Sequence, residues 1–323
     1  MQKILGKIKT EGWKSLLPEI RWHLETVYRR SVLHNRFVAH LFPFRQPPIL
    51  LLSYPRSGSS WVGDVLAASS QIAYLFEPVT GPYQKHYGGP ALADLNDPVV
   101  QRAYRQYSRD AFRGMPPKER YFHENLQGFS LPGRRRRYLL IKEVNPYAAE
   151  FYWQGYHPKI LFLVRHPAAV ALSFWNMGWL AQPDVQREAV QYEGDAWEKF
   201  GYSYGVVIKN ALDTLRRFSA PCEVLFYERL ASDPYAEFKK IFDYLSIAHP
   251  DDYAAVIQKY CYTDVASQGY DTRRVSTRMV AKWKKELSPD TIDKIRNGYF
   301  RSGLDFYRSD EDWLVASEGR VAP

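Results

Sequence analysis

The sequence predicts an α/β fold in which helices cover both faces of a doubly wound parallel sheet. Four short apolar runs are typical of buried parallel strands; they span 49–54, 138–141, 160–164 and 223–226. Helical patterns follow three of these runs, and strands that alternate with helices favour a parallel sheet. The chain has 323 residues, 46% apolar and 24% charged, which is ordinary for a globular protein and excludes a disordered or fibrous one.

Residues 1–47 form a basic N-terminal arm, and residues 48–323 form the main domain. The arm carries nine Lys or Arg and three Glu, a net charge of +6, and its apolar positions follow a helical period. Pro18 should divide it into two helices. We favour an arm packed on its own domain; the alternative is a peripheral contact with an anionic membrane or a partner.

Cysteine content and hydropathy indicate a cytoplasmic protein. Only Cys222 and Cys261 are present, which disfavours a disulfide scaffold and a cysteine zinc site. No apolar run reaches the roughly 18 residues of a membrane span. Three lysines interrupt the first ten residues, as a signal peptide would not allow. The net charge of +9 suits an anionic ligand.

The elements are expected in the following order. The run 49–54 leads into a loop of small residues, and a helix follows over 62–68. Loops and short helices should fill 81–137. A helix over 168–176 follows the third strand. Asp233-Pro234 and Ser288-Pro289 each read as the capped start of a helix, the first ending at Leu245.

The carboxyl ends of the predicted strands carry Arg56, Lys142, Arg165 and Tyr227. Ligands of open parallel sheets bind at these ends, so three cations predict a polyanionic nucleotide. Gly58 permits close backbone approach, and the amides of 57–61 can form an anion-binding nest at a helix N-terminus. Neither a Walker A spacing nor G-x-G-x-x-G occurs, which disfavours a metal-dependent NTPase and a Rossmann dehydrogenase.

The loop Tyr54-Pro55-Arg56-Ser57-Gly58-Ser59-Ser60-Trp61 resembles the 5′-phosphosulfate loop of sulfotransferases that use 3′-phosphoadenosine 5′-phosphosulfate (PAPS). Arg56 and the Ser-Gly-Ser-Ser that follows it resemble the carbohydrate-type enzymes of the family, whereas cytosolic members usually have Lys at this position. The segment 75–79, Leu-Phe-Glu-Pro-Val, also resembles the carbohydrate type. The resemblance implies a P-loop-like sulfotransferase core.

Three later segments extend the resemblance over roughly residues 48–300. Residues 163–167 with Ser173 resemble the 3′-phosphate motif, in which Arg165 and Ser173 grip the phosphate. The family usually has Asp where His166 stands, so the helix start should lack a negative cap. Residues 226–230 resemble the segment whose Tyr, here Tyr227, lines the adenine pocket. Residues 276–278 resemble the last cofactor loop.

The resemblance implies in-line transfer of a sulfuryl group from PAPS to a hydroxyl acceptor, with PAP as the product and no metal. Arg56 and Lys142 would stabilise charge, and Glu77 is the preferred general base, followed by Glu143 and then His123. The cofactor-binding residues are Arg56, Ser57, Gly58, Ser59, Ser60, Trp61, Arg165, Ser173, Tyr227, Ser276, Thr277 and Arg278.

The expected acceptor is a carbohydrate or a small alcohol or phenol, and no nucleic-acid partner is expected. Two alternatives remain open at this stage. One is a nucleotide-dependent phosphotransferase on the same core. The other is a non-catalytic protein that binds an anionic surface through residues 1–47.

Overall fold

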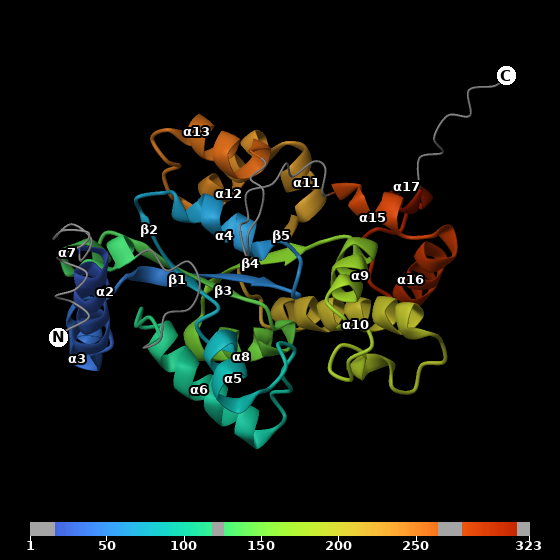
Figure 1. The fold of residues 1–323 in the computed structure, drawn as a ribbon, viewed down its shortest axis with the longest axis horizontal. Coiled ribbons are helices and arrows are strands. Elements are labelled where there is room, and N and C mark those ends of the chain that lie inside the picture. The colour runs from blue at the N-terminus through green and yellow to red at the C-terminus, as the bar shows by residue number, and fades with distance from the viewer. Residues whose placement is uncertain (1–16, 118–125, 264–279, 315–323) are drawn as a thin grey trace, which may run out of the picture.

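A five-stranded parallel sheet forms the centre of the computed structural model, which describes residues 17–117, 126–263 and 280–314 (Figure 1). The strand order is β2-β3-β1-β4-β5, with every adjacent pair parallel. The strands are β1 (Arg45–Ser53), β2 (Ile72–Phe76), β3 (Tyr138–Glu143), β4 (Lys159–Val164) and β5 (Cys222–Phe226). The predicted α/β class with a parallel sheet is confirmed.

Four of these strands were predicted, and β2 was not. Its last two residues, Leu75 and Phe76, were assigned to the segment 75–79, and the five-residue strand at the edge of the sheet was not recognised. β1 lies between β3 and β4, so the strand that enters the phosphosulfate-like loop is central. β1 begins at Arg45, three residues before the predicted domain boundary.

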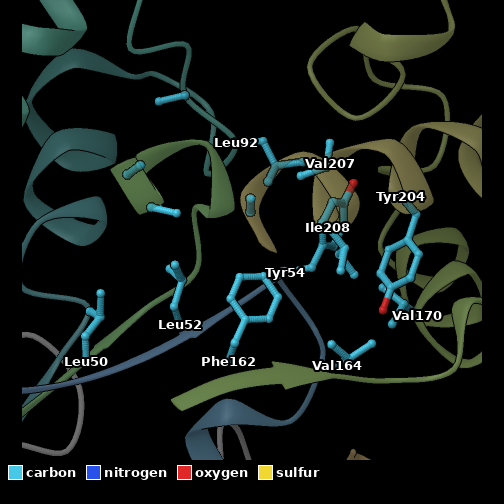
Figure 2. Close-up of a cluster of buried hydrophobic side chains, with 14 of the residues drawn as sticks. Leu50, Leu52, Tyr54, Leu92, Phe162, Val164, Val170, Tyr204, Val207 and Ile208 are labelled. Atoms are coloured by element: carbon cyan, nitrogen blue, oxygen red, sulfur yellow. The ribbon is translucent and has the colours of Figure 1, made fainter. Parts of the chain in front are cut away.

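Helices pack on both faces of the sheet (Figure 1). α4 (Ser59–Ala67), α12 (Pro234–Leu245) and α13 (Tyr253–Ile257) cover one face; α6 (Pro98–Ala111), α8 (Ala149–Tyr156) and α10 (Ala196–Arg217) cover the other. Alternate side chains of β1 enter the two apolar clusters, as a strand buried on both sides requires. Figure 2 shows Leu50, Leu52 and Phe162 in the cluster on the α10 side.

Side-chain caps explain the helices that were predicted correctly. Asp233 accepts the Ala236 amide at the start of α12, and Ser288 accepts the Thr291 amide at the start of α16 (Pro289–Arg301). α9 (Pro167–Asn176) matches its prediction within one residue, whereas α4 begins three residues earlier than expected.

The prediction of loops and short helices over 81–137 was wrong for α6, which has 14 residues. Asp97 caps this helix and Pro98 opens it, while Val100, Ala103, Tyr104 and Ala111 form its buried face. The polar composition of the segment concealed this periodicity.

Shorter elements complete the described chain. α2 (Leu17–Tyr28) has Pro18 in its first turn. No helix in the described ranges is long and apolar enough to cross a membrane. These elements are α2 (Leu17–Tyr28), η2 (Arg29–Leu33), α3 (Arg36–Leu41), α5 (Thr80–Tyr87), η3 (Leu126–Phe129), α7 (Leu131–Arg134), η4 (Pro146–Ala148), η5 (Arg187–Ala189), α11 (Tyr227–Ser232), η6 (Gln258–Tyr262), α15 (Lys282–Glu286) and α17 (Asp310–Trp313).

Candidate active site

The loop between β1 and α4 holds two residues with left-handed backbone. Gly58 has φ 94° and caps α4, and Arg56 has φ 67°. A positive φ in a residue other than glycine is strained and persists only where surrounding contacts impose it. The Ser53 hydroxyl donates to the Ser59 hydroxyl at 2.8 Å, which ties the start of α4 to the end of β1. The first-turn amides of α4 have no partners within the helix and can bind an anion.

Arg56, Arg165 and Ser173 meet at this loop. The Arg56 Nε donates to the Ser173 hydroxyl at 2.9 Å, and the Arg165 Nη1 donates to the Arg56 carbonyl oxygen at 3.2 Å. Arg165 follows β4 directly and Ser173 lies on α9, so residues more than 100 positions apart in sequence are brought together. Two guanidiniums at one loop create a strongly positive site.

The Tyr227 ring lies over the Arg165 guanidinium, 4.2 Å from its central carbon to the ring centroid. The same ring packs against Gly58, where a Cβ would lie 2.6 Å from the Tyr227 Cε2. Only glycine therefore fits this position, for its backbone angle and for its space. Trp61 packs edge-on against Tyr227 at 5.3 Å and is only 5% exposed, so it supports the Tyr227 ring from the core.

His166 caps α9 with a neutral side chain, in keeping with the expectation that this helix start lacks a negative cap. Its Nδ1 accepts the Ala168 amide at 3.3 Å, which assigns the ring proton to Nε2. The imidazole stacks on Trp283 at a centroid distance of 4.4 Å, with Tyr307 and Trp313 against its edges. Burial, with the positive charges of Lys284 and Arg165, holds the His166 pKa well below its usual value. A neutral imidazole thus replaces the carboxylate of the family pattern.

Two residues that the sequence analysis did not assign a role position this segment. Tyr204 lies on α10 (Figure 2), and its hydroxyl donates to the Arg165 carbonyl at 2.5 Å. Glu228 accepts the His166 amide at 2.9 Å and the Tyr307 hydroxyl at 2.5 Å. Burial raises the pKa of Glu228. Glu228 stands next to Tyr227 in a segment that the resemblance had singled out, and that adjacency was its only sequence signal.

Glu77 and Lys142 form an ion pair at the ends of β2 and β3. The Lys142 side chain is 2% exposed and the Glu77 side chain 20%, so the carboxylate is the member that faces solvent. The Lys142 ammonium also lies 4.2 Å from the centroid of the Phe76 ring. Lys142 pairs with Leu51 of β1, which places this ion pair one strand away from the phosphosulfate-like loop.

Glu143 points away from solvent and anchors the chain after Glu77. Its carboxylate accepts the Val79 amide at 2.7 Å, the Thr80 amide at 3.2 Å and the Thr80 hydroxyl at 2.5 Å. Burial is the main reason that the Glu143 pKa is raised to about 7. These contacts fix the turn that carries Glu77, whose φ of 43° is itself strained.

Several sequence-predicted residues lie outside the described ranges: Ser276, Thr277, Arg278 and His123. Among the others, Ser57 is fully buried and Ser59 is 3% exposed. The Ser57 amide donates to the Tyr54 carbonyl at 3.3 Å, and the Ser59 hydroxyl accepts from Ser53. Ser60 is half-buried in the first turn of α4.

A family model described as the sulfotransferase domain matches residues 152–303. This span contains Arg165, Ser173 and Tyr227, while the β1–α4 loop and the Glu77–Lys142 pair precede it. The match confirms the resemblance to the sulfotransferase family, and it supports a sulfotransferase activity for the chain. No curated protein matches the chain.

Solved structures of sulfotransferases are similar to this chain at low identity. The sulfotransferase domain from the curacin biosynthetic pathway has 16% identity and a TM-score of 0.47, covering 81% of this chain and 99% of that one. The sulfotransferase domain of the olefin synthase from Synechococcus PCC 7002 has 20% identity, a TM-score of 0.46 and coverages of 79% and 94%. Mouse sulfotransferase SULT7A1, complexed with PAP, has 14% identity, a TM-score of 0.44 and coverages of 88% and 94%.

Proposed function

We propose that this protein is a PAPS-dependent sulfotransferase that acts on a hydroxyl acceptor. The observation that carries the proposal is the meeting of Arg56, Arg165 and Ser173 beside the N-terminus of α4. This donor set consists of two guanidiniums, a hydroxyl and helix amides, and it suits a ligand with phosphate groups at two separate positions.

The first step assigned to the chain is binding of the nucleotide. Arg56 and the amides of 57–60 would hold the 5′-phosphate side, while Arg165 and Ser173 would hold the 3′-phosphate. Tyr227 would form the adenine side of the pocket, already held in place over Arg165, and Trp61 would support it from behind. Ser276, Thr277 and Arg278 are proposed to complete it.

Charge stabilisation is the second role of the chain. When bound, the nucleotide supplies an activated sulfuryl group, and transfer builds negative charge on the oxygen that leaves. Arg56 would stabilise that charge, as positioning and electrostatics dominate the related phosphoryl transfers. Lys142, on the adjacent strand β3, would add positive charge beside the sulfuryl group that is transferred.

Glu77 is our candidate for the general base that takes the acceptor's proton. Its side chain is partly exposed, whereas Glu143 has both oxygens engaged by the backbone and side chain of the following turn. The Lys142 ammonium, which contacts the Glu77 carboxylate, would keep that carboxylate oriented until the acceptor binds. The acceptor is proposed to be a carbohydrate or a small alcohol or phenol.

The proposal is tested by incubating the protein with PAPS and pools of candidate acceptors in the presence of a metal chelator. We expect an acceptor to gain the mass of one SO₃ group while PAP accumulates. A gain of a phosphoryl group from ATP with Mg²⁺, and none from PAPS, would support the phosphotransferase alternative instead. Arg56→Ala serves as the inactive control for either reaction.

A further inference from the structure

Helix α2 presents an apolar stripe that the described chain leaves open. Leu17, Ile20, Leu24 and Val27 are 60%, 48%, 64% and 48% exposed. At 3.6 residues per turn, spacings of three, four and three place these side chains within about 80° of one another around the helix. Isolated exposed apolar residues are common, but four on one stripe of one helix mark an interaction surface.

The neighbouring helix α3 adds apolar surface at the same end of the molecule. Phe37 is 69% exposed and Leu41 is 43% exposed, one turn apart on α3. α2 and α3 lie together beside α7, at the end of the molecule where β1 begins (Figure 1). This end is opposite the end of β1 that leads to Arg56, so contact here leaves the candidate active site open.

Basic side chains border this apolar surface. By helical geometry, Arg21 and His23 lie on either side of the α2 stripe, and both are exposed. Arg36 on α3 is 55% exposed. At the end of α7, Arg135 is exposed and donates to the Leu41 carbonyl at 2.8 Å, which brings a cation to the end of α3.

Acidic side chains do not cancel this charge. Residues 17–47 contain five Arg and two Glu, a net charge of +3. Asp110, from α6, lies 3.5 Å from Arg36 and 4.0 Å from His34 and is largely buried. The outward charge at this end is therefore positive around an apolar centre.

We propose that α2 and α3 dock on an anionic lipid surface, with the stripe Leu17, Ile20, Leu24 and Val27 entering the headgroup boundary. Amphipathic helices with an apolar face and a basic border bind anionic membranes in this way. A second copy of the chain is the less suitable occupant, since a two-fold contact through this surface would bring like charges together. The proposal is independent of the proposed catalytic function.

The test is co-flotation of the full chain with vesicles of phosphatidylcholine alone or with added phosphatidylglycerol. We expect binding to the anionic vesicles, weakened by salt, and little binding to the neutral ones. Ile20→Asp with Leu24→Asp should lower the partition coefficient at least about tenfold. Val99→Asp with Val190→Asp is the matched control, because both valines are exposed, at 54% and 78%, on other elements.

A second variant separates the apolar from the electrostatic contribution. Replacing Leu17, Ile20, Leu24 and Val27 by Ser leaves the charge unchanged and should still abolish stable binding, while circular dichroism and the melting temperature report whether the fold is kept. Equal binding of the wild type and the Ser variant, or no binding to anionic vesicles, would overturn the proposal. So would a dimer in light scattering that both stripe variants dissociate while vesicle binding is absent.

Discussion

The Arg165 guanidinium lies 3.2 Å from the backbone carbonyl oxygen of Arg56, while the Arg56 side chain itself reaches Ser173. The residue at the end of β4 thus supports the backbone of the loop that ends β1. One contact couples the proposed 3′-phosphate residue to the proposed 5′-phosphosulfate residue, and it occurs where Arg56 has a strained positive φ.

Arg56→Ala should nearly abolish transfer, because a donor aimed at developing charge is lost; we expect a fall of about a hundredfold or more in turnover. Ser173→Ala should have a smaller effect, since it removes one hydrogen bond that orients Arg56. Initial rates with PAPS measure both effects. Arg216→Ala, which removes an exposed arginine on α10, is the control. Turnover of Arg56→Ala at the wild-type level would refute the assignment.

Gly58→Ala should destabilise the loop and weaken nucleotide binding, because a Cβ there meets the Tyr227 ring at 2.6 Å. The left-handed backbone alone costs about 1–2 kcal/mol. Gly178→Ala isolates that cost, since Gly178 has φ 70° and a Cβ added there would have nothing within 4 Å. Denaturant melts of both variants should show a larger loss in the free energy of unfolding for Gly58→Ala. Equal losses would show that the Tyr227 ring moves aside without destabilising the protein.

His166 makes stability depend on pH in one direction. The pKa of His166 in the folded protein lies below its ordinary value. As the pH falls, the imidazole is therefore protonated in the unfolded chain before it is protonated in the folded one, and this favours unfolding. The wild type should lose stability as pH falls through about 6.5, by up to roughly 1.4 kcal/mol per pH unit. His166→Asn keeps a capping acceptor without this titration.

Melts of the wild type and His166→Asn between pH 8 and pH 5 check the prediction by their difference. The other groups near the imidazole (Lys284, Arg165, Tyr307 and Glu228) are present in both proteins, so their titration cancels to first order. If the stabilities of the wild type and His166→Asn changed by the same amount over this pH range, a buried neutral His166 would be contradicted.

Glu77→Gln should lower turnover by about 10²–10⁴-fold while the affinity for PAP holds, because the variant loses a proton acceptor but keeps its shape. Glu143→Gln is the comparison. It should chiefly lower the melting temperature, since an amide cannot accept all the hydrogen bonds that the carboxylate receives from Val79 and Thr80. Wild-type turnover of Glu77→Gln would move the base to Glu143 or His123.

Much of the site follows from sequence because parallel strands end at the same edge of a sheet. Lys142 and Arg165 directly follow an apolar run, and Arg56 follows one after Pro55, so their approximate neighbourhood is fixed once the runs are read as strands. Residues whose role depends on helix packing were not predictable. Tyr204 and Trp283 reach the β4–α9 junction only because α10 and α15 pack there, and their local sequence carries no sign of it.

The run Arg134–Arg137 is a feature that sequence alone misreads, because four successive arginines are typical of a solvated loop. Arg134 is fully buried and donates to the carbonyls of Phe42, Gly114 and Arg113. Arg137 likewise donates to the Ser70 carbonyl at 2.9 Å. A run of like charges predicts an exposed segment, because the carbonyl oxygens that accept its hydrogen bonds are distant in sequence and only the fold brings them near.

The most direct test of the central claim compares calorimetric titrations of PAP and adenosine 5′-monophosphate, in a metal chelator, on the wild type and on Arg165→Ala. We expect the wild type to prefer PAP by about thirtyfold or more, as one charge-assisted contact implies, and Arg165→Ala to lose most of that preference. An unchanged preference in the variant, or equal affinity of the wild type for both nucleotides, would contradict the central claim.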